Sequence, residues 1–194
     1  MGKPNFACQG EFDGLCGQYA VINSLTECGT LRSWEDQEKV FKIGLSCAKS
    51  KMAIYDGAYL SDIKKLLSAL PKQMLDGLSV EYPFSSKGGD GIPRKLKSDE
   101  YVEQLSNILN ERKVVCAMIG IKRESDDWSE HWIVVKGKGR FFEFIDSINQ
   151  HRRSRKKKHL TSLGIAHRRD GQEETDDWRI VYPRDVVLFR RKAT

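Results

Sequence analysis

The sequence contains no long hydrophobic run and no recognisable targeting segment. Hydrophobic residues make up 39% of its 194 residues and charged residues 31%, and no apolar stretch approaches the roughly 20 residues that cross a bilayer as a helix. The opening residues M-G-K-P-N-F contain neither the apolar part of a secretory signal nor the Ser or Thr of a myristoylation pattern. We therefore expect no transmembrane segment and a cytoplasmic protein, with export by a signal-independent route left open.

Paired cysteines are also missing. The chain has five cysteines and no C-x-x-C spacing, which disfavours both a disulfide framework and a structural zinc site. We expect no metal and no cofactor. Cys47 falls on a predicted helix and Cys116 in the apolar run V-V-C-A-M-I-G-I, where a cysteine usually serves as a small buried hydrophobe.

Acidic residues are absent from one segment, and that segment accounts for the excess of positive charge. Lysine and arginine together number 33 and aspartate and glutamate 27, which gives a net charge of +6. Residues 151–159, H-R-R-S-R-K-K-K-H, contribute six basic side chains and no acid. These six are Arg152, Arg153, Arg155, Lys156, Lys157 and Lys158. The basic character therefore belongs to one patch and not to the whole chain.

This composition predicts a solvated basic loop, about residues 149–177, inserted between strands of a sheet. Its functional alternatives are an acidic protein partner, nucleic acid, an anionic membrane and a nuclear import signal. No aromatic residue interleaves with the basic ones, which disfavours stacking on single-stranded nucleic acid. Nucleic acid is thus the less favoured partner. The histidines His151, His159 and His167 are expected to add exposed charge rather than catalysis.

Hydrophobic periodicity divides the chain into a helical first half and a stranded second half. The expected helices cover residues 16–27, 33–50, 59–70 and 98–112, and the expected strands cover residues 78–84, 114–121, 132–136, 141–145, 178–182 and 185–190. Strands and helices do not alternate as in a parallel sheet, and there is no internal repeat or long linker. We expect a single α+β domain over residues 1–194, in which residues 114–121 form a central strand buried on both faces.

One stretch near the N-terminus, residues 9–25 (Q-G-E-F-D-G-L-C-G-Q-Y-A-V-I-N-S-L), sets Cys16 at the expected start of the first helix. We expect Asp13 or Gly14 to cap this helix. Cys16 then lies in the first turn, where unpaired N–H groups and the helix dipole favour a thiolate. The alternative for Cys16 is a buried helix cysteine. Gln9 offers a side-chain amide able to donate to an oxyanion, and its alternative is a surface amide.

A base and an orienting group for this thiolate follow from a predicted hairpin. His131 opens an apolar strand after a polar loop, so we expect it to be partly exposed and rigidly held, as suits a general base. Residues 137–140, G-K-G-R, predict a turn. The midpoint between His131 and Asp146 lies inside that turn, so the two residues should meet at one edge of the sheet, where Asp146 can accept from the imidazole. The rivals of Asp146 for this role are Asp126, Asp127 and Glu130.

The order Gln…Gly-x-Cys-Gly…His…Asp resembles the papain-like cysteine proteases, in the compact bacterial form whose third member is an aspartate. The resemblance covers about residues 6–28 and 114–148. It implies a papain-like fold, with an N-terminal helical part whose central helix carries the nucleophile and a C-terminal antiparallel sheet. The roles it implies are nucleophile for Cys16, base for His131, orienting residue for Asp146 and oxyanion donor for Gln9.

Three further residues are candidates for contact with a substrate. Gly14 lies two residues before the cysteine, and Trp128 and Trp132 bracket the histidine. The two tryptophans are expected either to wall a substrate groove or to belong to the core.

Together these residues predict hydrolysis of an amide bond in a peptide or protein through an acyl-enzyme on the cysteine. Deamidation of a glutamine and acyl transfer stay open, because they use the same thiolate with a different substrate group or a different second nucleophile. An alternative of another class is a non-catalytic binding module, in which the basic segment holds an acidic partner or nucleic acid and the cysteine is incidental.

Overall fold

The protein is described from a computed structural model. The residues that the structure describes are 15–47, 58–84, 98–123, 130–138, 141–147, 153–156, 160–161, 164–169, 172–175, 178–180 and 185–193.

All four helices that the hydrophobic period predicts are present. They are α1 (Cys16–Glu27), α2 (Trp34–Cys47), α3 (Leu60–Ala69), which is followed by the 3-10 helix η2 (Lys72–Leu75), and α4 (Ser98–Leu109). The strands are β1 (Leu78–Glu81), β2 (Val114–Arg123), β3 (Glu130–Lys138), β4 (Phe141–Ile145), β5 (Arg153–Lys156), β6 (Leu160–Thr161), β7 (Gly164–Arg169), β8 (Gln172–Thr175), β9 (Trp178–Ile180) and β10 (Val186–Arg191).

The helix starts of α1 and α2 differ in how they are capped. The Ser33 hydroxyl accepts from the Asp36 N–H at 3.2 Å, and the Asp36 carboxylate accepts from the Arg32 N–H at 3.2 Å, so side chains cap the start of α2 in a reciprocal pattern. At α1 the N-cap position is occupied by Leu15, whose side chain makes no capping hydrogen bond. Asp13 and Gly14, which the sequence predicts as the cap, lie outside the described residues.

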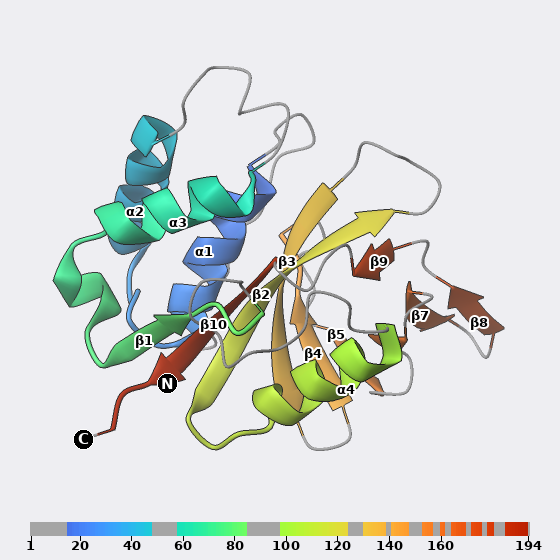
Figure 1. The fold of residues 1–194 in the computed structure, drawn as a ribbon. Coiled ribbons are helices and arrows are strands. Elements are labelled where there is room, and N and C mark those ends of the chain that lie inside the picture. The colour runs from blue at the N-terminus through green and yellow to red at the C-terminus, as the bar shows by residue number, and fades with distance from the viewer. Residues whose placement is uncertain are drawn as a thin grey trace.

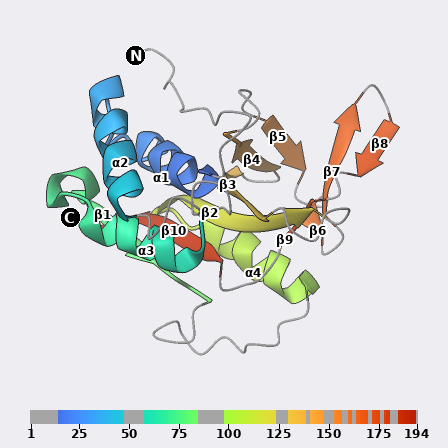
Figure 2. The ribbon, with the colours of Figure 1, turned by 90° about the horizontal axis from the view of Figure 1, so that it is seen from above.

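The main sheet is antiparallel throughout its described pairings. Its strand order is β1-β10-β2-β3-β4-β5, with β9 pairing to β2 beyond the end of β10. A separate small sheet has the order β6-β7-β8. Figure 1 shows α1, α2 and α3 on one side of the main sheet and α4 on the other. Figures 1 and 2 show β7 and β8 at the end of the molecule away from α2. The fold is therefore α+β, with N-terminal helices packed on an antiparallel sheet.

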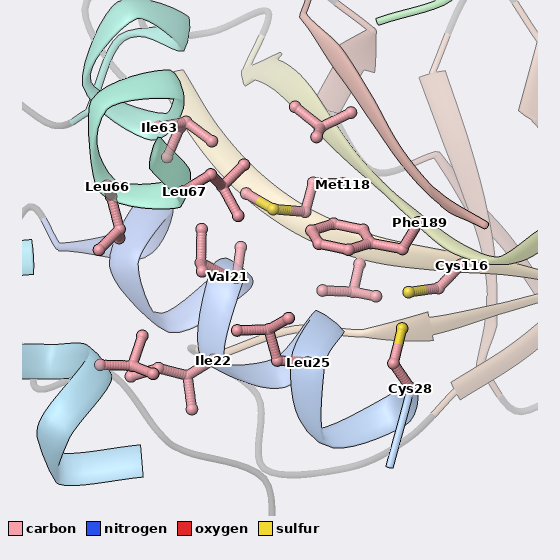
Figure 3. Packing of buried hydrophobic residues seen from close by; sticks show 14 of the residues in the cluster. Val21, Ile22, Leu25, Cys28, Ile63, Leu66, Leu67, Cys116, Met118 and Phe189 are labelled. Atoms are coloured by element: carbon pink, nitrogen blue, oxygen red, sulfur yellow. The ribbon is translucent and has the colours of Figure 1, made fainter. Parts of the chain in front are cut away.

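The two faces of the sheet carry two separate hydrophobic clusters. On the α1 side, Val21 and Leu25 of α1 pack with Met118 and Phe189 of the sheet (Figure 3). On the α4 side, Leu105 of α4 packs in a second cluster with sheet residues such as Ile119 and Leu188. Burial of each such side chain stabilises the fold by roughly 1.5–3 kcal/mol relative to leaving it exposed.

Strand β2 supplies side chains to both clusters. Cys116 and Met118 face the α1 side, Ala117 and Ile119 face the α4 side, and all four are 0% exposed. The prediction of a central strand buried on both faces is confirmed.

The predicted hairpin is present, but its register differs by one position in each strand. β3 continues to Lys138, which pairs with Phe141, and the pairing runs back to Val134 opposite Ile145. Continued by one pair, this register sets Asp146 opposite Ile133, so Asp146 lies diagonal to His131 instead of directly across from it. The correction follows from the length of β3, which extends two residues beyond the predicted strand end.

The basic segment contains strands, and the prediction of a loop over residues 149–177 is wrong in this respect. β5 pairs with β4, and β6, β7 and β8 form the small sheet. In the β7–β8 register Arg168 is opposite Glu173 and His167 is opposite Glu174. Opposite charges across a strand pair favour the pairing, so they favour hairpin formation in this polar stretch.

Across the described ranges, no helix combines the length and the apolar character needed to cross a membrane.

Candidate active site

Cys16 is the first residue of α1, and the helix lies across the central strands of the sheet. α1 contacts both β2 and β3, and the Cys16 side chain is buried in the cluster that joins them. No acidic side chain lies in the first turn of α1, so no carboxylate of that turn offsets the positive end of the helix dipole. The structure thus holds the sulfur at a helix start that favours negative charge.

His131 and Asp146 form a direct hydrogen bond. The imidazole Nε2 and the Asp146 Oδ1 are 2.9 Å apart, which is within the range of a charge-assisted hydrogen bond. The hairpin β3–β4 brings the two residues together from positions 15 apart in sequence. The expectation that these residues meet at one edge of the sheet is confirmed.

The third contact joins the histidine to the cysteine. The His131 side chain hydrogen-bonds Cys16 as well as Asp146. Because Nε2 faces the carboxylate, Nδ1 is the ring nitrogen available to the sulfur. The structure therefore brings Cys16, His131 and Asp146 into one chain of contacts, in the order thiol, imidazole, carboxylate.

His131 is buried, contrary to the expectation of partial exposure. Its side chain is 4% exposed, whereas that of Asp146 is 26% exposed. The difference arises because β3 is an interior strand, paired with β2 on one side and β4 on the other. The imidazole is shielded from bulk water, while its carboxylate partner keeps contact with solvent.

Two opposing influences set the protonation of His131. Burial lowers its pKa, and the hydrogen bonds and negative charges of Asp146 and Cys16 raise it by more, to about 9. At neutral pH the favoured state is therefore an imidazolium between two acidic partners. A protonated imidazole beside a thiolate is the ion pair from which thiol nucleophiles react.

Gly17 allows a neighbouring segment to approach the cysteine closely. A Cβ at position 17 would lie 2.5 Å from the Ala58 Cβ and 2.7 Å from the Ile63 Cδ1, and contacts this short do not occur between real side chains. The indole N–H of Trp132 donates to the Ala58 carbonyl at 2.6 Å. Ala58 is therefore fixed both to the start of α1, beside Cys16, and to the strand that carries His131.

Trp132 belongs to the core and does not form an open wall. It is 3% exposed and lies in the α1-side cluster, which corresponds to the second of its two expected roles. An exposed aromatic instead lies at Tyr59, next to Ala58, with 63% of its surface exposed. Its N–H donates to the Asp62 carboxylate at 3.2 Å, which holds the backbone in place. Sequence reasoning missed Ala58, because a nearby signal, Asp62 in a helix start, indicates capping and not a site.

Several predicted site residues lie outside the described part of the structure, so their roles stay predictions. Among the catalytic and substrate candidates these are Gln9, Gly14 and Trp128, and among the rivals of Asp146 they are Asp126 and Asp127. Arg152, Lys157 and Lys158 of the basic patch also lie outside it, whereas Arg153, Arg155 and Lys156 form part of β5.

Cys116 and Cys47 lie outside the chain of contacts that begins at Cys16. Cys116 is fully buried, and its thiol contacts Cys28 at the end of α1 (Figure 3). Burial raises the pKa of the Cys116 thiol, which makes it a poor nucleophile. The predicted role of Cys116 as a buried hydrophobe is confirmed, while Cys47 is only half-buried. Within the described residues no three His, Cys, Asp or Glu side chains are grouped as a metal site.

Neither the scan against protein-family models nor the search of the curated proteins gave a match.

Proposed function

We propose that the protein is a papain-like cysteine hydrolase that cleaves an amide bond in a peptide or protein. The observation that carries this proposal is the chain of contacts from Cys16 through His131 to Asp146. Cys16 lies on a helix, and His131 lies on the antiparallel sheet against which that helix packs. This arrangement supports the papain-like assignment, because the resemblance implies a nucleophile on the central helix and a base on the sheet.

The contacts supply the steps of an acyl transfer. The Cys16 thiolate attacks the substrate carbonyl, and the carbon–sulfur bond forms as negative charge moves to the carbonyl oxygen. In this proposal the backbone N–H of Cys16, at the start of α1, stabilises that oxyanion, with Gln9 as the predicted second donor. His131 then gives its proton to the leaving nitrogen, and the carbon–nitrogen bond breaks.

Water completes the cycle. His131, now neutral, takes a proton from water as its oxygen attacks the acyl-enzyme, and the thiolate leaves from the second tetrahedral intermediate. Throughout, Asp146 holds the imidazole ring through Nε2 and stabilises its charged form. The described residues thus provide a nucleophile, a proton carrier and an orienting carboxylate without any added group.

The same steps allow two related reactions. A glutamine side chain in place of a backbone amide would be deamidated, and an amine in place of water would be acylated. The substrate groove decides between them, and we propose hydrolysis of a peptide or protein as the primary reaction.

In the first experiment the protein is incubated with a substrate-mimicking electrophile, such as a peptide vinyl sulfone. Covalent adducts are then detected by intact mass spectrometry of the protein. We expect one adduct on Cys16, and none in Cys16→Ala. Cys47→Ala is the matched control, because Cys47 is a half-buried helix cysteine outside the contact chain, and it should label like the unmodified protein. Labelling that persists in Cys16→Ala, or is lost in Cys47→Ala, would contradict the proposal.

Candidate substrate proteins are then incubated with the enzyme, and their masses are measured by intact mass spectrometry. Cleavage gives a large loss of mass, deamidation a gain of about one dalton, and transfer an adduct, as follows from the second nucleophile. Activity that survives intact in Cys16→Ala would instead favour the non-catalytic binding module.

A further inference from the structure

β5 is the last strand of the main sheet and has one edge that no described strand covers. It pairs with β4 over four positions, from Phe141 opposite Lys156 to Phe144 opposite Arg153. Among the described residues no strand pairs with its second edge. Such an edge presents a row of backbone N–H and C=O groups that can accept another strand.

The start of β5 lies at the same end of the sheet as the candidate active site. Arg153 pairs with Phe144, and Asp146, which bonds His131, follows Phe144 by two residues. A chain that pairs with the outer edge of β5 therefore passes close to the end of the sheet where Cys16 and His131 meet.

The charge of β5 is not matched by acids across its own pairing. Three of its four residues are basic, and Arg153, Arg155 and Lys156 are opposite phenylalanines in the register. The contrast is β7, where Arg168 is opposite Glu173. In the described registers β7 thus has acidic residues opposite Arg168 and His167, whereas the three basic residues of β5 have none opposite them.

We propose that the outer edge of β5 binds an acidic segment of the substrate as an added strand, so that the proposed hydrolase selects acidic proteins. The proposal rests on the proposed function. Backbone hydrogen bonds along the edge provide affinity in this binding mode, and the basic residues of β5 provide selectivity. A second copy of the basic strand is repelled from the edge, so the charges also prevent the protein from pairing with itself.

The geometry sets the distance from the acidic segment to the reactive bond. Neighbouring strands lie about 4.8 Å apart, so a strand added to β5 is three spacings, or about 14 Å, from β3. An extended chain covers about 3.3 Å per residue. We therefore expect the acidic segment to lie about four to five residues from the amide that reaches Cys16.

The test measures binding apart from catalysis. The Cys16→Ala protein is titrated against a fluorescein-labelled peptide of alternating Glu and Val, and binding is followed by fluorescence polarisation. We expect binding that weakens as salt is raised, because exposed charges are screened. One control peptide has Lys in place of Glu, and a second keeps every Glu but has Pro in place of Val, which removes the backbone donors needed for strand pairing. Both controls should bind weakly.

The matched protein variants remove the same charge in two places. The triple variant R153Q/R155Q/K156Q and the control R168Q/R169Q/K192Q each lower the net charge from +6 to +3. We expect the first to weaken peptide binding about threefold to hundredfold, as for the loss of three exposed ion pairs, and the control to change it much less. Denaturant unfolding of both variants shows whether each is folded, and the proline peptide tests the same idea on the protein with β5 intact.

The outcomes separate this inference from the proposed function. Equal binding of the proline peptide, equal loss in the two triple variants, or preferred binding of a single-stranded oligonucleotide over the acidic peptide would overturn the added-strand proposal. If the electrophile labels Cys16 but the acidic peptide does not bind, the hydrolase stands and this inference falls. If the peptide binds and Cys16 is not labelled, β5 is a docking strand and the hydrolase falls.

Discussion

His131 holds a proton in a position where burial by itself would remove it. The charges and hydrogen bonds of Asp146 and Cys16 outweigh the loss of solvation and raise the pKa to about 9, compared with about 6.5 for an ordinary histidine. The raised pKa is therefore a property of the folded site, which an isolated histidine does not have.

The pH dependence of stability tests this account. The contribution of His131 to the free energy of unfolding is fully present below about pH 6.5 and is lost as the pH rises through about 9, because the folded state binds the proton more tightly than the unfolded state. We expect Asp146→Asn to lower the pKa of His131 toward about 6.5 and to flatten this pH dependence. Proton NMR titration of the His131 ring measures the pKa directly. A folded-state pKa of His131 at or below about 6.5 in the unmodified protein would contradict this account of its charge.

Gly17 is needed for a close approach and not for backbone freedom. Alanine is normally the better helix residue, by roughly 1 kcal/mol, but at position 17 its Cβ would overlap Ala58 and Ile63. We expect Gly17→Ala to lower the free energy of unfolding by about 1–3 kcal/mol, the usual cost of overpacking, and to slow labelling of Cys16. Denaturant unfolding and the electrophile assay measure the two effects.

Gly44→Ala is the control for this substitution. Gly44 also lies in a helix, but its Cβ would have a single contact under 3.0 Å, with the Gln18 Cγ at 2.9 Å, whereas a Cβ at position 17 would have two shorter ones. It should destabilise less than Gly17→Ala. If Gly17→Ala were as stable as the unmodified protein and labelled as fast, the close packing of Ala58 against α1 would not matter to the site.

At the scale of elements, hydrophobic periodicity and turn residues predict the helix that carries Cys16 and the hairpin that carries His131 and Asp146, because local sequence determines both. The boundaries of α1 agree with the predicted residues 16–27, and the hairpin joins His131 to Asp146. The register differs because the length of β3 depends on its pairing with both β2 and β4, which no local pattern records. The pairing of the two site residues survives this error because a diagonal position is still within reach of long side chains.

The strands of residues 153–175 could not be predicted because their sequence resembles a solvated loop. β5 reads R-S-R-K and β8 reads Q-E-E-T, and neither has the apolar alternation of a half-buried strand. Their pairing depends on the preceding strand, which is β4 for β5 and the oppositely charged β7 for β8. The contacts of Ala58 with Gly17 and Trp132 are also tertiary contacts between residues far apart in the sequence. The sequence near position 58 contains no pattern that predicts them.

At the scale of the whole molecule, one sheet joins two cores with different consequences for the site. The α1-side cluster holds the helix that carries Cys16, whereas the α4-side cluster packs the opposite face. Both depend on β2, whose side chains alternate between them. Loss of either core should therefore weaken the same cooperative unit, but only the α1-side core contains Cys16 and so fixes its position against His131.

Two matched core substitutions test this division. Leu25 on α1 and Leu105 on α4 are both 0% exposed, and truncation of either to alanine should lower the free energy of unfolding by about 2–5 kcal/mol. We expect both variants to show a single unfolding transition that coincides by near-UV and far-UV circular dichroism. Under native conditions Leu25→Ala should slow the labelling of Cys16, because the helix can then shift against β3, while Leu105→Ala should leave the rate nearly unchanged. Equal slowing in both variants would mean that the position of Cys16 depends on the sheet as a whole, and separate transitions would mean that the two cores unfold independently.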